Sequence, residues 1–333
     1  MKSWKSYSRR GALATIAAGV TLAAGMATTA NANPTSTWPQ KPVRIVVPFP
    51  AGGTGDLIAR ALGNNLREMW GQPVLIENRG GANGTIGTAH VARAEPDGHT
   101  LILAAASHIM NPPLFPKLSY DAVKSFTPIM RLGSYPMAVV VNANTPYKTL
   151  ADLTAALKAD PGSVSVASTG PGSAPHLAAA LFEQGIGGKF THVPYQGSGP
   201  MMMAILSGQV TASFHGATIW DQVRAGKVRA LAITGDKRLA DQPTVPTIAE
   251  LGHPGYNVLV WYGMLAPAGM DPALRDRLYR DIKKAMGSDA VAAPMKTAGI
   301  FAEDMNPEQF KASLEREAVQ WRKVIQEAGI KPE

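Results

Sequence analysis

A short apolar run that ends in a glycine turn and continues as a helix constrains the fold of this chain more than any other feature. It reads "RIVVPFPAGGTGDLIARAL" and spans Arg44 to Leu62. The β-branched residues Ile45 to Val47 favour a buried strand, and the apolar residues after Asp56 recur at helical spacing. A strand joined to a helix through glycines is typical of α/β proteins, and such a turn can hold an anion. The nature of that anion would decide the function.

The rest of the chain alternates strand-like and helix-like segments, which argues for an α/β architecture. The order strand, helix, strand, helix, strand near the beginning predicts a parallel sheet with right-handed crossovers, and a second unit of this kind follows. Two long helices are predicted after Asp271-Pro272 and Asn306-Pro307, where an N-cap residue precedes proline. The predicted strands span residues 43–49, 73–78, 99–106, 137–142, 163–168, 191–195, 210–216, 228–234 and 256–267.

The layout of the first stretch recurs in "VSVASTGPGSAPHLAAALF", which starts at Val164 and again joins a strand, a glycine turn and a helix. Two similar lobes could each aim a helix N-terminus at a common cleft. The alternative is that strand, turn and helix simply recur, as they do in any α/β protein. The sequence leaves both interpretations open.

The two glycine turns carry the groups that an anion site needs. In the first, Ala51 to Asp56, glycines leave the backbone N–H groups accessible and the helix N-terminus adds positive potential. The alternative is a tight turn in which Asp56 caps the helix. The turn lacks the lysine of a phosphate-binding loop, and Ile58 stands where the dinucleotide fingerprint needs glycine. We therefore expect a carboxylate or phosphate group and no nucleotide.

The second turn, Ser168 to Ser173, offers hydroxyl groups and glycines before a helix. A serine hydrolase is the sharper alternative, but "GPGSAPH" does not fit the G-x-S-x-G pattern. His176 follows Ser173 by three residues and is not expected to act as its base. We therefore expect no enzyme activity.

Several classes of site lack the residues that they need. The chain has no cysteine, and its seven histidines show no H-x-x-x-H pair and no neighbouring acidic cluster. We expect no metal and no cofactor. No long run of Lys and Arg with interleaved aromatic residues appears, so nucleic acid is not an expected partner. His215 stands out because it ends a predicted strand beside a turn, although it could equally be structural.

The first 32 residues have the pattern of a secretory signal peptide. Lys2, Lys5, Arg9 and Arg10 precede a short run of small apolar residues, and Ala30-Asn31-Ala32 fits the cleavage rule. We expect cleavage after Ala32 and a periplasmic protein, which would lower the formal net charge from +8 to +4. A membrane anchor is the alternative, and the run is short for one. The arginine pair leaves the choice between the general and the twin-arginine export route open.

Many segments resemble one family. They include "WPQKPVRIVVPFPAGGTGDLIARAL", "GQPVLIENRGGANGTIGTAHVARAEPDGHTLIL", "VPYQGSGPMMMAILSGQV", "AGKVRALAITGDKR", "PTVPTIAELGHPGY" and "WYGMLAPAG". These segments are similar to the Bug (Bordetella uptake gene) receptors, the periplasmic solute-binding components of tripartite tricarboxylate transporters. The resemblance runs from Trp38 to the C-terminal helices.

The resemblance implies a two-lobed type II periplasmic-binding-protein fold in which each lobe is a mainly parallel sheet flanked by helices. Residues 33–138 and 260–333 would form lobe 1, and residues 139–259 would form lobe 2. Two hinge strands, near residues 135–142 and 258–266, would join the lobes. The implied partners are a small carboxylate and the membrane permease subunits, with the receptor itself a monomer.

Members of this family hold their ligand between the lobes, mostly a small carboxylate. Carried over by motif, the ligand-binding residues are expected at the turns that follow the strands of both lobes. They are Phe49, Gly52, Gly53, Thr54, Asp56, Asn83, Ser107, Ser168, Thr169, Ser173, Tyr195, Gly197, Ser198 and His215.

His215 is a departure, because many members have aspartate at this position. An aspartate can pair with the amino group of an amino acid, whereas a histidine can donate a hydrogen bond to a second carboxylate. We therefore expect a di- or tricarboxylate, aromatic acids included, with Phe214, Trp220 and Trp261 as apolar walls. A receptor that signals to a membrane sensor is the alternative to one that feeds a transporter, and both would use the same cleft.

Overall fold

The computed structural model of the chain describes residues 37–115 and 117–330, besides Met1. Contacts divide the chain into a unit of residues 1–38 and a unit of residues 39–333, and the fold described below is that of the second unit. The signal peptide expected at residues 1–32, with its cleavage site after Ala32, lies outside the described residues. Within the described part, no helix is both long enough and apolar enough to cross a membrane.

The first of two sheets combines the beginning and the end of the chain. In the described part its strands are β1 (Val43–Val47), β2 (Val74–Asn78), β3 (Thr100–Ala105), β4 (Phe126–Pro136), β10 (Leu259–Pro267) and β11 (Phe301–Met305). Their order is β11-β4-β10-β3-β1-β2. β1 lies parallel to β2 and β3, as the alternation of strands and helices predicts. β10 runs antiparallel to β3 and β4, and β11 runs antiparallel to β4.

The second sheet is built from the middle of the chain. Its described strands are β5 (Ala138–Asn142), β6 (Ser165–Ser168), β7 (Thr191–Pro194), β8 (Ala212–His215) and β9 (Val228–Ile233). Their order is β7-β6-β8-β5-β9. β6 lies parallel to β7 and β8, whereas β5 runs antiparallel to β8 and β9.

The two-lobed α/β fold expected from the sequence is therefore confirmed, but the sheets are mixed rather than mainly parallel. The reason is the route of the chain. β5 enters the second sheet from β4, and β10 returns to the first sheet, so both run against the strands that carry the glycine turns. β1 and β3 of the first sheet and β6 and β8 of the second sheet all have their carboxyl ends at the cavity described below.

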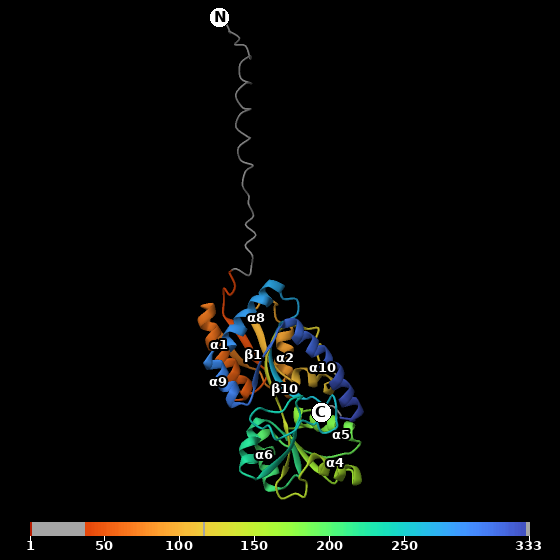
Figure 1. Cartoon of the computed structure of the whole chain (residues 1–333). Helices are drawn as coiled ribbons and strands as arrows, with labels where there is room; N and C mark the ends of the chain where they lie inside the picture. The colour runs from red at the N-terminus through yellow and green to blue at the C-terminus, as the bar shows by residue number, and fades with distance from the viewer. Residues whose placement is uncertain (2–36, 116, 331–333) are drawn as a thin grey trace. The chain divides into compact units, whose positions relative to one another are not determined.

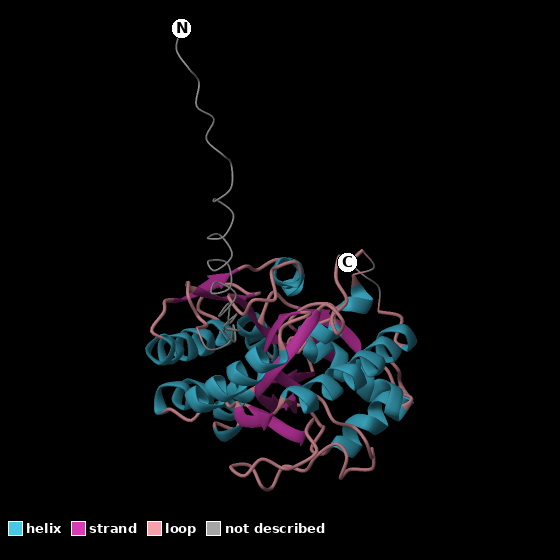
Figure 2. Cartoon of the chain, turned by 90° about the horizontal axis from the view of Figure 1, so that it is seen from above, coloured by secondary structure: helices cyan, strands magenta, loops and turns pink. Residues whose placement is uncertain are grey.

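Helices flank both sheets, as Figures 1 and 2 show. The apolar residues Ile58, Leu62, Leu66 and Trp70 lie one turn apart along α1 and are buried, which fixes the face that this helix turns to the sheet. The described helices are α1 (Thr54–Trp70), α2 (Thr85–Ala92), α3 (Ser107–Met110), α4 (Leu150–Ala159), α5 (Ala174–Ile186), α6 (Ser198–Ser207), α7 (Trp220–Arg224), α8 (Pro272–Met286), α9 (Asp289–Thr297) and α10 (Pro307–Glu327), with 3-10 turns η1 (Ala82–Gly84), η2 (Pro112–Leu114) and η3 (Ala217–Ile219).

The chain crosses between the sheets at Met137, between β4 and β5, and again between β9 and β10. Thr234 joins the two crossing segments. Its backbone N–H donates to the Met137 carbonyl at 2.8 Å, and the Val258 N–H donates to the Thr234 carbonyl at 2.9 Å. Its fully buried hydroxyl accepts from the Met137 N–H at 2.8 Å and donates to the Val258 carbonyl at 2.6 Å. One side chain thus satisfies a buried donor and a buried acceptor from different crossings.

Replacing Thr234 tests this junction. Thr234→Val keeps the shape but leaves the Met137 N–H and the Val258 carbonyl each short of one hydrogen bond. We expect the free energy of unfolding to fall by about 2–4 kcal/mol, because each buried polar group left unpaired costs roughly 1–3 kcal/mol. Thr234→Ser keeps the hydroxyl and should lose much less. Urea unfolding of both variants measures the difference, and equal losses would show that the hydroxyl is not the cause.

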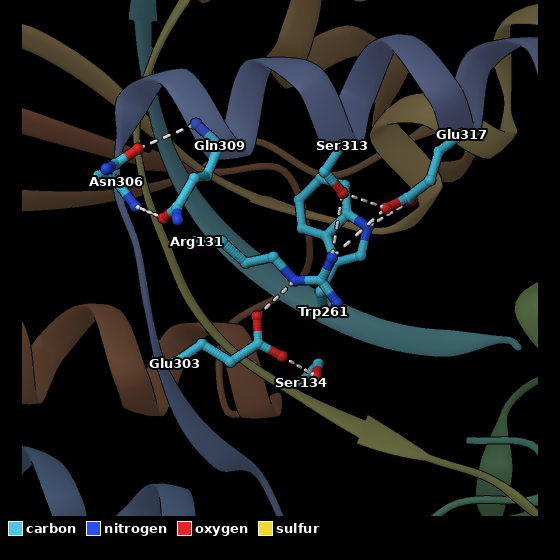
Figure 3. Close-up of polar contacts among 8 residues, drawn as sticks. All are labelled: Arg131, Ser134, Trp261, Glu303, Asn306, Gln309, Ser313 and Glu317. Atoms are coloured by element: carbon cyan, nitrogen blue, oxygen red, sulfur yellow. Dashed lines mark hydrogen bonds and ion pairs between the residues drawn. The ribbon is translucent and has the colours of Figure 1, made fainter. Parts of the chain in front are cut away.

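A second polar network ties the edge strand β11 and helix α10 to β4 of the first sheet (Figure 3). Arg131 of β4 is buried, and its guanidinium lies 2.8 Å from Glu303 of β11 and 3.4 Å from Glu317 of α10. Glu317 also accepts hydrogen bonds from the Trp261 indole and the Ser313 hydroxyl, both at 2.8 Å. Arg131 is thus the cation that two largely buried carboxylates share.

Arg131→Met should therefore be severely destabilising. It leaves Glu303 and Glu317 largely buried without their cation, and removing one partner of a buried ion pair costs about 3–5 kcal/mol. The exposed pair of Arg238 and Glu250, at 2.8 Å, is the matched control, since both side chains are over 40% accessible. Arg238→Met should cost less than about 1 kcal/mol. Similar losses for the two variants in chemical denaturation would contradict the role given to Arg131.

Candidate functional site

A cavity of about 500 Å³ is lined by residues from both sheets. It lies at the carboxyl ends of β1, β3, β6 and β8, the edge at which open α/β sheets bind their ligands. The structure brings eight of the residues predicted from the sequence into its wall. They are Phe49, Thr54, Asn83, Ser107, Thr169, Ser173, Ser198 and His215.

Three helix N-termini reach this cavity. Thr54 is the first residue of α1, Ala174 of α5 and Ser198 of α6, and all three line the wall. None of these helices has a side-chain hydrogen bond at its N-cap. α4, α8 and α10 are capped by the side chains of their N-cap residues, whereas α2, α3, α7 and α9 also lack such a cap, so it is the convergence of the three N-termini that sets the cavity apart. Uncapped N-termini offer free N–H groups and positive potential, so their convergence suits an anion.

The first glycine turn is shaped by Asp56, which does not line the cavity. The Asp56 carboxylate accepts hydrogen bonds from the Gly52 N–H and from Arg60, both at 2.9 Å. Burial alone would raise the pKa of Asp56, but these hydrogen bonds, with one involving Asn78, outweigh it and keep the pKa below its usual value. Gly52 has a φ of +83°, which favours glycine. Gly52, Gly53 and Asp56 thus set the position of Thr54 and stay outside the wall.

The second glycine turn is held by two stacked histidines. The Ser168 hydroxyl lies 2.6 Å from His192 Nε2 and accepts from the Gly170 N–H at 3.1 Å. The Gly172 N–H donates to His176 Nδ1 at 3.0 Å, and the two imidazoles stack with centroids 3.7 Å apart. Ser168 is engaged behind the turn and does not line the cavity, unlike Thr169 and Ser173.

Ser173 is the N-cap residue of α5, but its hydroxyl makes no capping bond. The oxygen is buried and has no hydrogen-bond partner in the described part of the chain. A serine at this position ordinarily caps its helix, so this hydroxyl remains available to a ligand. Tyr195 and Gly197 lie outside the wall, in the turn that leads into α6, where the Gly197 N–H donates to the Tyr195 carbonyl at 3.0 Å.

Asn83 enters the wall in a strained conformation. Ala82 and Asn83 have φ values of +44° and +53°, which residues other than glycine rarely adopt. The Asn83 side chain donates to Asn111 at 2.9 Å, and the buried Asn111 side chain donates back to the Asn83 carbonyl at 2.7 Å. This reciprocal pair holds the strained turn, as at many binding sites. A neighbouring cavity of about 470 Å³ shares Asn83, Thr169 and Ser173 with the first.

His215 and two tyrosines complete the wall. Burial lowers the pKa of His215, against a smaller effect of its contact with the Gly216 carbonyl, so the ring is neutral. Burial raises the pKa of Tyr135 and of Tyr262, so both keep their hydroxyl protons. Gly216 makes room for Tyr135, because a Cβ there would lie 3.1 Å from the Tyr135 ring. Among the described lining residues there is no Asp, Glu, Lys or Arg.

The apolar walls differ from those expected. Phe214 packs among core aromatic rings, Trp261 packs edge-to-face on Phe310, and Trp220 lies in a separate core cluster. Alternation along a strand explains this, because His215 and Tyr262 face the cavity and their neighbours Phe214 and Trp261 face the other way. Apart from Phe49, which was predicted, the apolar lining includes residues that the sequence did not assign to the site, such as Met137, Met201 and Val260.

Tyr135 was also missed as a site residue, because the sequence predicted only a hinge strand near residues 135–142 and not β4 itself, which runs from Phe126 to Pro136. β4 contains prolines at both ends, which argue against a strand in the sequence. Tyr262 could have been found from the alternation with Val260 in the predicted strand at residues 256–267. In the described residues, no group of three or more His, Asp or Glu side chains is placed to hold a metal ion.

The histidine pair should make stability depend on pH. Burial, with a smaller effect of His192, lowers the pKa of His176 to about 4. The unfolded chain therefore binds this proton more readily, at about pH 6.5, so stability is lost as the pH falls from there towards 4. His176→Asn keeps an acceptor for the Gly172 N–H and cannot titrate. Urea unfolding at several pH values should give it a slope smaller by about one proton, and an unchanged slope would contradict the assignment.

Residues 58–330 match the family described as the tripartite tricarboxylate transporter family receptor. Among individual relatives, the chain is 36% identical to Protein BugT of Bordetella pertussis over 298 residues, which cover 89% of this chain and 91% of that one.

Solved structures agree with this match. The periplasmic binding protein BugD has a TM-score of 0.73 and 33% identity, covering 89% of this chain and 100% of its own. Rpa4515 of Rhodopseudomonas palustris, solved with adipate, has a TM-score of 0.75 and 32% identity over 89% and 100% of the two chains. MatC of the same organism, solved with bound malate, has a TM-score of 0.72 and 32% identity over 86% and 100%.

Proposed function

Because the chain belongs to the tripartite tricarboxylate transporter family of receptors, we propose that it captures a small organic carboxylate in the 500 Å³ cavity and delivers it to the permease subunits of such a transporter. The observation that carries the proposal is the convergence of three uncapped helix N-termini on one cavity. The described wall of this cavity contains no Asp, Glu, Lys or Arg, and its histidine, His215, is charged only when protonated. Neutral donors of this kind can hold a carboxylate and still release it.

A ligand with two carboxylates fits this arrangement better than one with a single carboxylate. Donors stand on opposite sides, with Thr54 of α1 in one half of the molecule and Ser173 and Ser198 in the other. Each half can then hold one carboxylate. The related structures with adipate and malate contain dicarboxylates, which supports this choice. An amino-acid ligand is disfavoured, since no carboxylate in the described wall could pair with its ammonium group.

The proposal places the protein in the periplasm, where the related binding protein BugD is found, with the expected signal peptide directing its export. A role as a sensor would use the same cleft. A hydrolase is not favoured by the contact between Ser168 and His192, because the serine is 1% accessible and already bonds to the Gly170 backbone. We therefore propose binding without covalent chemistry.

A ligand panel with two matched serine variants tests the proposal. Thermal shift and calorimetry with succinate, malate, adipate, glutamate and butyrate should show stabilisation by dicarboxylates above all. Ser198→Ala and Ser173→Ala each remove a donor to a charged group, worth about 1.5–3 kcal/mol, so dicarboxylate affinity should fall roughly tenfold or more.

Ser207→Ala is the control, because this serine ends the same helix α6 and bonds to the Ala204 carbonyl at 3.2 Å. It should leave the affinity unchanged. Equal losses in Ser198→Ala and Ser207→Ala would remove the α6 N-terminus from the site. If none of the acids in the panel bound, the proposed function would be wrong. Tighter binding of butyrate than of succinate would contradict the dicarboxylate class, and tighter binding of glutamate, a dicarboxylate with an ammonium group, would contradict the argument against an amino-acid ligand.

A further inference from the structure

One nitrogen of His215 has no hydrogen-bond partner among the described residues. The side chain ends β8, is 2% accessible and lines the cavity. Its Nδ1 lies 3.3 Å from the Gly216 carbonyl oxygen, whereas its Nε2 is buried without a hydrogen-bond partner in the described part of the chain. A carbonyl can only accept a hydrogen bond, so the contact places the ring proton on Nδ1. In the neutral ring, Nε2 then carries a lone pair and can only accept.

The surroundings of His215 supply no charge to change this state. The strands beside it, β5 and β6, and helix α6 contain no ionisable residue. α5 brings His176, which accepts from Gly172, and Glu183, whose carboxylate accepts from the Phe190 N–H. Across the cavity, β4 and β10 turn only the protonated hydroxyls of Tyr135 and Tyr262 to the wall, because Arg131 of β4 is paired with Glu303 and Glu317 and does not line the cavity.

A bound dicarboxylate would change the electrostatic surroundings of His215. A carboxylate placed against Nε2 would face a lone pair, and a second buried negative charge would have no cation in the described wall. Burying an uncompensated charge is costly, whereas one proton on Nε2 turns repulsion into a charge-assisted hydrogen bond.

Building on the proposed function, we propose that loading a dicarboxylate draws one proton from the solvent onto Nε2 of His215, so that ligand and proton enter the cavity together. The imidazole becomes an imidazolium, and the proton returns to the solvent when the ligand leaves. His215 thus selects for a second carboxylate by changing its own charge, and not by donating from its neutral form.

The proposed coupling between ligand binding and protonation of His215 predicts how the affinity changes with pH. Burial lowers the pKa of His215 in the empty protein, and a bound carboxylate raises it. Between these two values binding takes up a proton, so dicarboxylate affinity should increase as the pH falls, by up to about tenfold per pH unit. At pH 7 and above both carboxylates of the ligand are almost fully ionised, so the change in affinity between pH 7 and pH 8 separates this effect from titration of the ligand itself.

Titration calorimetry of the purified protein measures the proton directly. Succinate, malate and adipate are titrated at pH 7.5 in phosphate and in Tris, whose ionisation enthalpies differ. The apparent enthalpies should differ by an amount that corresponds to uptake of up to about one proton per ligand. Affinities at pH 6, 7 and 8 should rise towards the acidic end.

His215→Gln provides a donor of similar size that cannot titrate. It should abolish proton uptake and leave an affinity that changes little from pH 6 to 8. His253→Gln, in a separate cavity beside α5 and α10, is the matched control and should behave like the wild type.

The outcomes separate the two proposals. Binding of the dicarboxylates without proton uptake by the wild type would overturn the inference and leave the proposed function standing. So would tight binding of malate alone without uptake, because its hydroxyl would then donate to Nε2. Uptake that persists in His215→Gln would assign the proton to another group and also overturn the inference. If no dicarboxylate bound, the proposed function would fail, and the inference with it.

Discussion

The junction at Thr234 is the constraint on which the arrangement of this protein depends. The chain passes between the sheets at only two described points, and Thr234 bonds to both through its backbone and its hydroxyl. This fixes where β4 leaves the first sheet and β10 returns to it. The strands that carry the glycine turns then end facing each other, and the helices that follow them begin at the same cavity.

Because side chains alternate along a strand, one face of the first sheet contributes to the cavity and the other packs against α10. Tyr262 of β10 faces the cavity, whereas its neighbour Trp261 faces away and donates to Glu317. The network around Arg131 (Figure 3) therefore lies in the structural layer under α10 and brings no charged group into the wall of the cavity. Charges that stabilise the fold are in this way kept apart from the site, whose donors are neutral.

Neutral donors explain several otherwise separate observations at the cavity. Uncapped helix N-termini, the unpaired Ser173 hydroxyl and the unpaired His215 nitrogen are each unfavourable in a closed interior. The helix N-termini and the Ser173 hydroxyl are complementary to an anion in their neutral state, whereas the His215 nitrogen becomes so only when it takes up a proton. The groups behind them are held by hydrogen bonds, as those of Asp56 with Gly52 and of His176 with Gly172 illustrate. Hydrogen bonds therefore hold the turns on the side that packs against the protein, whereas the groups on the cavity side keep hydrogen-bonding capacity for a ligand.

The sequence by itself determined the elements and the two turns. Periodicity located most strands and the long helices, and the N-cap residues Asp271 and Asn306 are present as predicted because these signals act within a few residues. The resemblance of the motifs to one family indicated the two-lobed fold and eight residues of the cavity wall.

Only the tertiary structure decided the direction of β4, β5 and β10 and the side of each strand that meets the cavity. It also separated Asp56 and Ser168, which shape the turns, from Thr54 and Ser173, which line the wall. These properties depend on contacts between residues far apart in the chain, such as Thr234 with Met137 or Asn83 with Asn111. Local patterns cannot report them, because hydrogen-bond partners are chosen only when distant segments pack together.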